Sequence, residues 1–166
     1  MGKWIGYALI LIGSAGFGMA KGQELQWHLK ELEIIKQVLY FTRSELQGTR
    51  STFEEIFRKI AKKFAGKYGE WLQSLAESLE KKEEQSFETI WKISVETYWA
   101  NSYLTKEEIK ELKEFGKSIS YIEAINMYID QLEYEIKITR EAYQPKRRLC
   151  QSLGIMGGVF LIILLL

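Results

Sequence analysis

Uncharged, apolar stretches lie at both ends of this chain, and every acidic residue lies between them. The stretches run from Trp4 to Ala20 and from Leu149 to Leu166. At about 1.5 Å of rise per residue, helices of roughly 17 and 18 residues are about 26 Å long, close to a hydrocarbon core of about 30 Å. The pattern predicts a transmembrane helix at each end (residues 1–21 and 149–166) with one domain (22–148) between them.

The N-terminal stretch also fits a second interpretation. Lys3 gives it a short basic start, and Gly18, Met19 and Ala20 are typical of the small residues that precede a signal peptidase cut. Cleavage after Ala20 would leave an extracytoplasmic helical scaffold that is anchored by its C-terminal tail alone. This alternative stays open at the level of the sequence.

Basic residues beside the apolar stretches predict how the chain is oriented. Lys146, Arg147 and Arg148 directly precede the second stretch, and Lys21 directly follows the first. Since cytoplasmic flanks are enriched in Lys and Arg, the central domain should be cytoplasmic.

Small residues four positions apart allow helix backbones to approach closely in lipid. The pairs Gly154 with Gly158 and Ser14 with Gly18 have this spacing. They are therefore candidates for packing between membrane helices.

Apolar residues in the middle of the chain recur every three or four positions, which predicts helices throughout. Ser51 with Glu54 and Thr105 with Glu108 have the spacing of capping boxes, which open helices. Gly66 and Gly69 bracket a turn. We expect an all-α fold, a six-helix bundle, with helices over 23–47, from Ser51 to Phe64, over 71–79, from Ser86 to Trp99, from Thr105 to Phe115, and from Tyr121 toward Pro145.

Composition excludes several classes of function. Of the 23 Lys and Arg residues only Lys3 lies outside the central part, so the charges there balance, and the basic excess of a nucleic-acid binder is missing. The single histidine, His28, and the single cysteine, Cys150, lack the partners that a metal site or a thiolate nucleophile requires. With no phosphate-binding GxxxxGK[ST] loop either, we expect neither an enzyme nor a bound cofactor.

Several segments resemble the stage III sporulation protein AB family. The C-terminal run from Arg148 to Gly158 and the opening Ile10–Ser14 are similar to that family's ends. The family's first turn is similar to the stretch that contains Glu45, Leu46, Ser51, Thr52 and Phe53. The segment that opens the family's fifth helix is similar to Leu104–Leu112 with Gly116. Gly48 and Thr52 depart from the family pattern, which has an aromatic residue and a proline there. Glu45, Ser51, Trp91, Thr105 and Gly116 are taken as family-like structural positions.

The resemblance implies a role in an endospore-forming bacterium. The chain would be a non-enzymatic platform of the channel complex between mother cell and forespore, located in the outer forespore membrane. Platform proteins of type II secretion and type IV pilus machines are similar to this family, and their cytoplasmic six-helix bundles face a hexameric ATPase. By that analogy the partner would be stage III sporulation protein AA, together with other channel proteins; self-association into a homo-oligomer is left open.

Overall fold

The fold is all-helical wherever it is described. A computed structural model describes the backbone of residues 2–48, 50–81 and 85–141, and the side chains from Gln23 onward within those ranges. Its helices are α1 (Gly2–Gly48), α2 (Phe53–Ala61), α3 (Lys67–Lys81), α4 (Phe87–Trp99), α5 (Lys106–Phe115) and a sixth over residues 122–141. The prediction of six helices and no strands is confirmed for these ranges.

The first helix contains both the N-terminal apolar stretch and the helix predicted over 23–47. α1 continues from Gly2 to Gly48 without a break, so the N-terminal stretch and the first bundle helix are one helix of 47 residues. No proline lies in this part of the sequence, so no backbone N–H donor is missing from the helix.

The described parts of the chain contain no helix with both the length and the apolar character needed to cross a membrane. The predicted span 149–166 lies outside the described residues, as do the side chains of residues 1–21. Both transmembrane helices therefore stay predictions.

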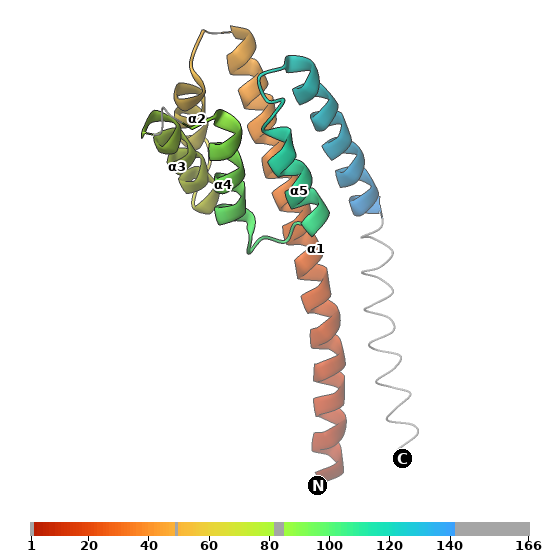
Figure 1. Cartoon of the computed structure of the whole chain (residues 1–166). Helices are drawn as coiled ribbons and strands as arrows, with labels where there is room; N and C mark the ends of the chain where they lie inside the picture. Colours follow the sequence, from red (N-terminus) through yellow and green to blue (C-terminus); the bar gives the residue numbers. More distant parts are fainter. Residues whose placement is uncertain (1, 49, 82–84, 142–166) are drawn as a thin grey trace. The chain divides into compact units, whose positions relative to one another are not determined.

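The chain divides into two compact units. One comprises Lys30–Glu135, and the other comprises Met1–Leu29 with Ile136–Leu166. Within the first unit, α2, α3 and α4 form one group, while α5 and the helix over 122–141 lie beside α1 (Figure 1). Hydrogen bonds from Tyr40 to Glu133 and from Arg43 to Asn126 join α1 to the last helix.

The core of this unit is built from the apolar stripes of all six helices. Aromatic rings contact one another from α2 to the last helix; Phe57 contacts Trp91, which contacts Phe115, which stacks on Tyr128. The tryptophans of the predicted stripes, Trp71, Trp91 and Trp99, are each at most 2% exposed. These three tryptophans are therefore part of the core. The largest fully buried side chains are Trp71, Trp91, Phe57, Leu32, Leu39, Ile56, Ile60, Leu72, Leu75, Leu112, Ile119 and Ile125.

Two local predictions place a residue slightly wrongly relative to its helix. The N-cap of α2 is Thr52 and not Ser51, and the Thr52 backbone N–H donates to the Glu55 carboxylate at 3.4 Å. Both hydroxyl residues are followed three positions later by a glutamate, so the spacing alone does not choose between them. Ser51 stands one residue before the cap.

Gly69 lies inside α3 and not in the turn before it. A Cβ atom at position 69 would come within 2.3 Å of the Phe64 carbonyl oxygen, so glycine allows α3 to approach the end of α2. Gly66 is the turn residue, with φ of +61°, in the left-handed region that glycine adopts without steric cost.

Candidate functional site

Trp91 of α4 and the C-terminal end of α5 form the centre of the candidate site. The indole Nε1–H of Trp91 donates to the Leu112 carbonyl oxygen at 2.7 Å, in a buried position. The backbone N–H of Gly116 bonds instead to Lys113, at 3.3 Å, so the last turn of α5 is tightened. The carbonyl oxygens in the last turn of a helix have no N–H partner within that helix, so a donor from another part of the chain must supply the hydrogen bond. Trp91 supplies it and thereby caps α5 from a neighbouring helix.

Gly116 is required for this arrangement. A Cβ atom at position 116 would lie 2.3 Å from Cδ1 and 2.7 Å from Cγ of Trp91. The backbone of Gly116 has φ of −54° and ψ of −25°, which any residue adopts. Close approach of the indole, and not backbone conformation, is therefore what favours glycine here.

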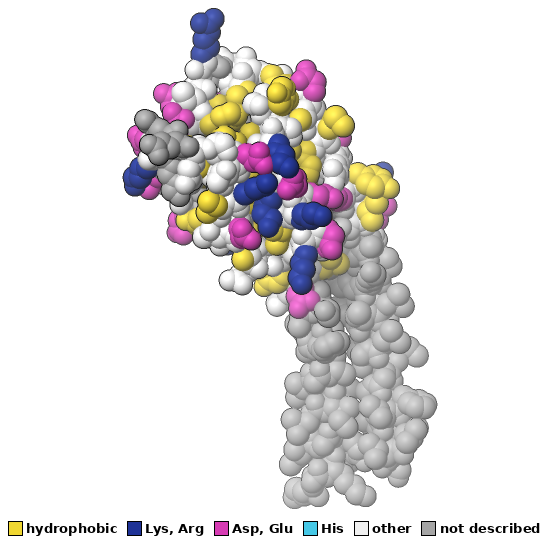
Figure 2. Space-filling model, in the orientation of Figure 1, with side chains coloured by type: hydrophobic (Ala, Val, Ile, Leu, Met, Phe, Trp, Pro, Cys, Tyr) yellow, Lys and Arg dark blue, Asp and Glu magenta, His cyan; other side chains and the backbone are white. Residues whose placement is uncertain are grey.

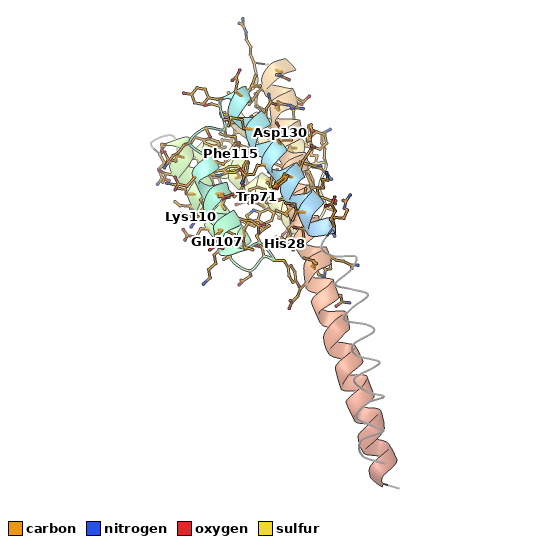
Figure 3. The ribbon with its side chains drawn as sticks, turned by 90° about the vertical axis from the view of Figure 1, so that its right-hand side faces the viewer. His28, Trp71, Glu107, Lys110, Phe115 and Asp130 are labelled. Atoms are coloured by element: carbon orange, nitrogen blue, oxygen red, sulfur yellow. The ribbon has the colours of Figure 1, made fainter. Side chains whose placement is uncertain are left out.

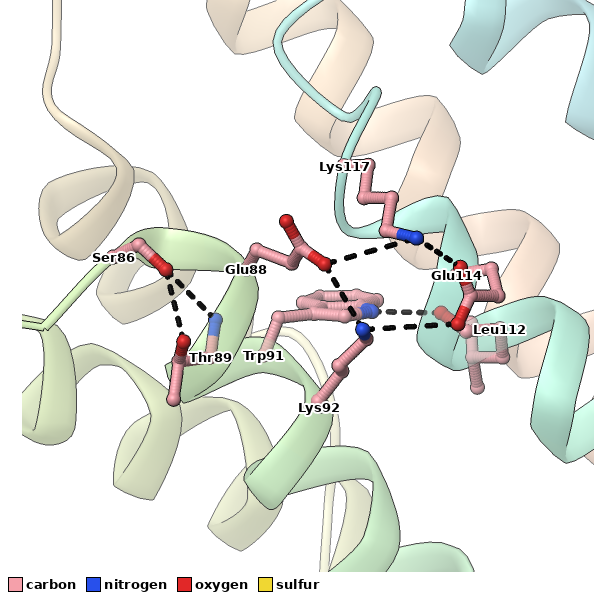
Figure 4. Close-up of polar contacts among 8 residues, drawn as sticks. All are labelled: Ser86, Glu88, Thr89, Trp91, Lys92, Leu112, Glu114 and Lys117. Atoms are coloured by element: carbon pink, nitrogen blue, oxygen red, sulfur yellow. Dashed lines mark hydrogen bonds and ion pairs between the residues drawn. The ribbon is translucent and has the colours of Figure 1, made fainter.

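Charged side chains form a network above the buried indole (Figure 4). Lys92 lies 2.9 Å from a Glu88 oxygen and 3.7 Å from a Glu114 oxygen. Lys117 pairs with Glu114 and lies 3.9 Å from Glu88. Two residues of α4, one of α5 and one just after α5 are thus joined by alternating charges. We call these four residues the α4–α5 charge network.

The network perturbs the ionisation of two members. The hydrogen bond from Lys92 to Glu88 raises the pKa of Lys92 above its ordinary value. The hydrogen bond from Lys117 lowers the pKa of the Glu114 carboxyl. Since all four side chains are at least about a third exposed, solvent screens these pairs, and they contribute little to stability.

This face carries basic and acidic side chains in alternation (Figure 2). Lys113 adds a further pair, 3.6 Å from Glu96. A surface of mixed sign lacks the basic excess that attracts nucleic acid. Within the described ranges, no group of three or more His, Cys, Asp or Glu side chains is placed to hold a metal ion. The arrangement suits contact with another protein surface of matching charge pattern.

A buried carboxylate lies in another part of the same unit. Glu31 of α1 is 0% exposed; its oxygens accept from Lys67 Nζ and from the Tyr103 backbone N–H, each at 2.6 Å. One side chain thereby joins α1, the start of α3 and the loop before α5. Burial acts to lower the pKa of Lys67, but the hydrogen bond and charge of Glu31 outweigh it, and the pKa of Lys67 is raised.

Sequence reasoning missed the role of Glu31. Its position four residues before the buried Ile35 places it on the apolar stripe of α1, which was an available signal. A charged residue on such a stripe requires a partner. The sequence offers no local signal that Lys67 and Tyr103 are those partners.

The structure brings together some of the family-like positions and separates others. Trp91 and Gly116 are in contact. Thr105 is the N-cap of α5, and its predicted capping box with Glu108 is confirmed, at 2.6 and 3.2 Å. Glu45 pairs with Lys59 at 2.9 Å, which joins α1 to α2.

The predicted membrane residues fall outside what is described. Gly154, Gly158, Lys146, Arg147 and Arg148 lie beyond residue 141. Ser14, Gly18 and Lys21 lie in α1, but their side chains are not among those described. These assignments stay predictions.

Known proteins resemble this chain over its length. A sequence profile described as stage III sporulation protein AB matches residues 3–166. Stage III sporulation protein AB of Bacillus subtilis (strain 168) is 23% identical over 170 residues, covering 99% of each chain. A solved structure of a stage III sporulation protein AB has a TM-score of 0.64 and 21% identity, covers 71% of this chain and 97% of that one, and supports the fold. Because the profile spans nearly all residues, this chain belongs to the stage III sporulation protein AB family.

Proposed function

We propose that this chain is a non-enzymatic membrane platform of the channel complex between mother cell and forespore. In this role it couples a cytoplasmic ATPase, stage III sporulation protein AA, to the membrane assembly. The family match over residues 3–166 carries the proposal. The bundle (22–148) lies in the cytoplasm, between the membrane helices 1–21 and 149–166.

The unbroken α1 supports this arrangement. A platform must transmit the position of its membrane helices to the domain that meets the ATPase. A single helix from Gly2 to Gly48 connects the N-terminal stretch to residues of the bundle core without a flexible loop.

The α4–α5 charge network is the proposed docking face for the ATPase. Its fixed alternation of signs gives a partner a pattern to match, and matched charges raise specificity and association rate. The buried bond from Trp91 to Leu112 holds the two helices in register beneath it.

Co-purification of stage III sporulation protein AA with the full-length chain from sporulating cells tests the coupling. Two variants test the face. The first reverses Lys92 and Lys117 to Glu; the second adds Glu88→Lys and Glu114→Lys, so that the pairs inside the network re-form with inverted signs. We expect both to lose the ATPase. Swapping the Glu45 and Lys59 pair is the matched control, and recovery should be unchanged.

Each outcome is informative. If the wild-type chain recovers no ATPase, the coupling role is wrong. If the four-residue swap recovers as much ATPase as wild type, the coupling can stand but the docking face is elsewhere. The control variant, with Glu45 and Lys59 swapped, must recover as much ATPase as wild type. Only then can the loss of ATPase from the network variants be assigned to the α4–α5 face.

Accessibility labelling tests the orientation. Gln85→Cys, in a Cys150→Ser background, places one thiol at an exposed position of the bundle. A membrane-impermeant maleimide should label it after lysis and not in intact cells. Labelling in intact cells would contradict the cytoplasmic placement and favour the signal-cleaved alternative, for which the mass of the mature N-terminus gives an independent reading.

Membrane packing is a separate part of the proposal. Replacing Gly154 and Gly158 by Leu would prevent close backbone approach in lipid. We expect reduced co-purification of other membrane proteins of the channel complex, whereas recovery of the ATPase should not change. Ser14 and Gly18 are the corresponding positions of the first membrane helix.

A further inference from the structure

Trp27 differs from the tryptophans of the bundle core in its exposure. Its side chain is 44% exposed, whereas Trp71, which Figure 3 labels among the side chains of the core, is 1% exposed. Trp27 lies on α1, and the fully buried residues of that helix come after it, with Glu31 and Leu32 at 0% and 1% exposed. Burial in the core therefore does not account for a tryptophan at position 27.

The position of Trp27 along α1 relates it to the apolar stretch from Trp4 to Ala20. Ile12 is the middle residue of that stretch, and one unbroken helix joins it to Trp27. At about 1.5 Å of rise per residue, the Cα atom of Trp27 lies about 22 Å from that of Ile12 along the axis. From the midplane of a bilayer, the hydrocarbon core ends at about 15 Å and the headgroup layer at about 20–22 Å. With the stretch centred in the bilayer, the Trp27 backbone lies at the outer edge of the headgroup layer.

The direction of the side chain brings the indole into that layer. In an α-helix every Cα–Cβ bond tilts toward the N-terminus, which for Trp27 is the side of the apolar stretch. The ring therefore lies nearer the bilayer midplane than the Cα atom does. A tilt of the helix from the bilayer normal moves the ring further in the same direction.

The chemistry of indole fits the headgroup layer. Its ring is apolar and its Nε1–H donates a hydrogen bond, and tryptophan is enriched where one end of a side chain is apolar and the other is wet. Charges of both signs lie nearby, since Glu24 comes between Lys21 and Lys30. The contact is therefore assigned to the indole and not to attraction by charge.

We infer that the Trp27 indole inserts into the headgroup layer that faces the bundle and donates its hydrogen bond to phospholipid oxygen atoms. The inference rests on the membrane arrangement proposed above, and it adds a lipid-binding residue outside the spanning stretch. An indole held there opposes movement of α1 along its axis, because the ring loses favourable contacts in water and its hydrogen bond in hydrocarbon.

Fluorescence quenching by labelled lipids tests the inference with the full-length chain in phosphatidylcholine vesicles, which carry no net charge. Trp4→Phe leaves Trp27 and the three core tryptophans, and the emission lost on adding Trp27→Phe is that of Trp27. One set of vesicles carries a nitroxide on the headgroup, and another carries it at the middle of the acyl chain. We expect the headgroup nitroxide to quench the Trp27 emission about threefold more than the chain nitroxide, because the indole lies outside the hydrocarbon core.

Tyr40 provides the control position. It is also exposed on α1, at 38%, but it lies more than three helical turns, about 20 Å, further from the apolar stretch than Trp27. Tyr40→Trp, added to Trp4→Phe and Trp27→Phe, should be quenched by acrylamide in the water and by neither labelled lipid. Equal melting temperatures of the variants exclude unfolding as the cause of a difference.

Trp4 separates failure of the inference from failure of the proposed membrane arrangement. In the Trp27→Phe variant, quenching of Trp4 by the labelled lipids reports whether the N-terminal stretch lies in the bilayer. If Trp4 is quenched and Trp27 is not, the inference alone is overturned; if neither is quenched, both are. Stronger quenching of Trp27 from the chain centre than from the headgroup, or equal lipid quenching in the Tyr40→Trp variant, would also overturn the inference.

Discussion

Gly116 is a residue whose substitution the structure constrains sharply. In an open αR position, replacing Gly by Ala stabilises by about 0.4–1 kcal/mol. Here the added Cβ would meet Trp91 at 2.3 Å, and overpacking of this kind costs about 1–3 kcal/mol. We expect Gly116→Ala to lower the free energy of unfolding, measured by chemical denaturation.

Gly48→Ala is the control for this prediction, because no atom lies within 4 Å of a Cβ built there. It should be neutral or slightly stabilising. A Gly116→Ala protein as stable as wild type would mean that Trp91 moves away at little cost, and that the fit of indole and backbone is not tight.

Lys67 should give the protein an alkaline component of stability. Its pKa is raised above the ordinary 10.5, so the folded state holds the proton more tightly than the unfolded state. The resulting stabilisation is complete below that ordinary value and is lost as the pH rises through the folded-state pKa. We expect Lys67→Met to cost about 1–3 kcal/mol at neutral pH, because it leaves Glu31 buried with one partner fewer.

Urea denaturation across about pH 9–12 checks this, since the gap in unfolding free energy between wild type and Lys67→Met should be constant below the ordinary pKa of Lys67 and narrow above it. Lys62→Met, at an exposed neighbouring position, removes the same charge without touching Glu31. A gap that stays constant with pH, or a similar cost for Lys62→Met, would argue against the pairing of Lys67 with Glu31.

At the scale of single helices, the N-caps can be tested against one another. The Thr105 hydroxyl accepts from the Glu108 N–H at 3.2 Å, and loss of such a cap costs about 1 kcal/mol. Thr105→Ala should therefore destabilise by that amount, whereas Ser51→Ala should cost much less because Ser51 is not a cap. Thermal and chemical denaturation of the two variants would show the difference; equal losses would contradict the assignment of the α2 cap to Thr52.

Helices were predictable from the sequence wherever the signal is local. The capping box of Thr105 and the start of α4 at Ser86 follow from residues within one turn. The N-cap of α2 was predicted one residue too early, because Ser51 and Thr52 are each followed by a glutamate three positions later. Gly69 was predicted to bound a turn, because the contact that requires glycine there, the close approach of the Phe64 carbonyl, comes from the segment after α2 and leaves no signal at position 69 itself.

The candidate site was less predictable for the same physical reason. Trp91 and Gly116 were marked by family resemblance, but spacing along the chain does not reveal that they touch. The α4–α5 charge network consists of ordinary surface residues, and only the packing of α4 on α5 gives them an order. Glu31 is recognisable as a charge on an apolar stripe, yet its partners come from distant segments.

For the bundle unit as a whole, the chain of ring contacts predicts a single cooperative core. Trp91→Phe removes the hydrogen bond to Leu112 and part of the packing volume, at a cost of about 2 kcal/mol. We expect the most protected amides of α1, around Leu32 to Leu39, to lose as much protection as those of α4 and α5. Hydrogen exchange of the full-length protein, followed by mass spectrometry, measures each helix separately.

A loss confined to α4 and α5 would show that these helices open independently of α1. Leu75→Ala is a matched comparison, because it removes a fully buried side chain from α3. If the unit is one cooperative structure, both variants should lower protection in the same set of amides.

Because Trp91 caps α5 next to Gly116, we expect substitutions at positions 91 and 116 to be coupled in evolution. The last turn of α5 fits a chain in which position 91 carries an indole and position 116 carries no side chain. Among descendants of a common ancestor, a larger residue at 116 should therefore accompany a smaller one at 91. Such paired replacement would show that the side chain at position 91 of α4 and the residue that ends α5 change together.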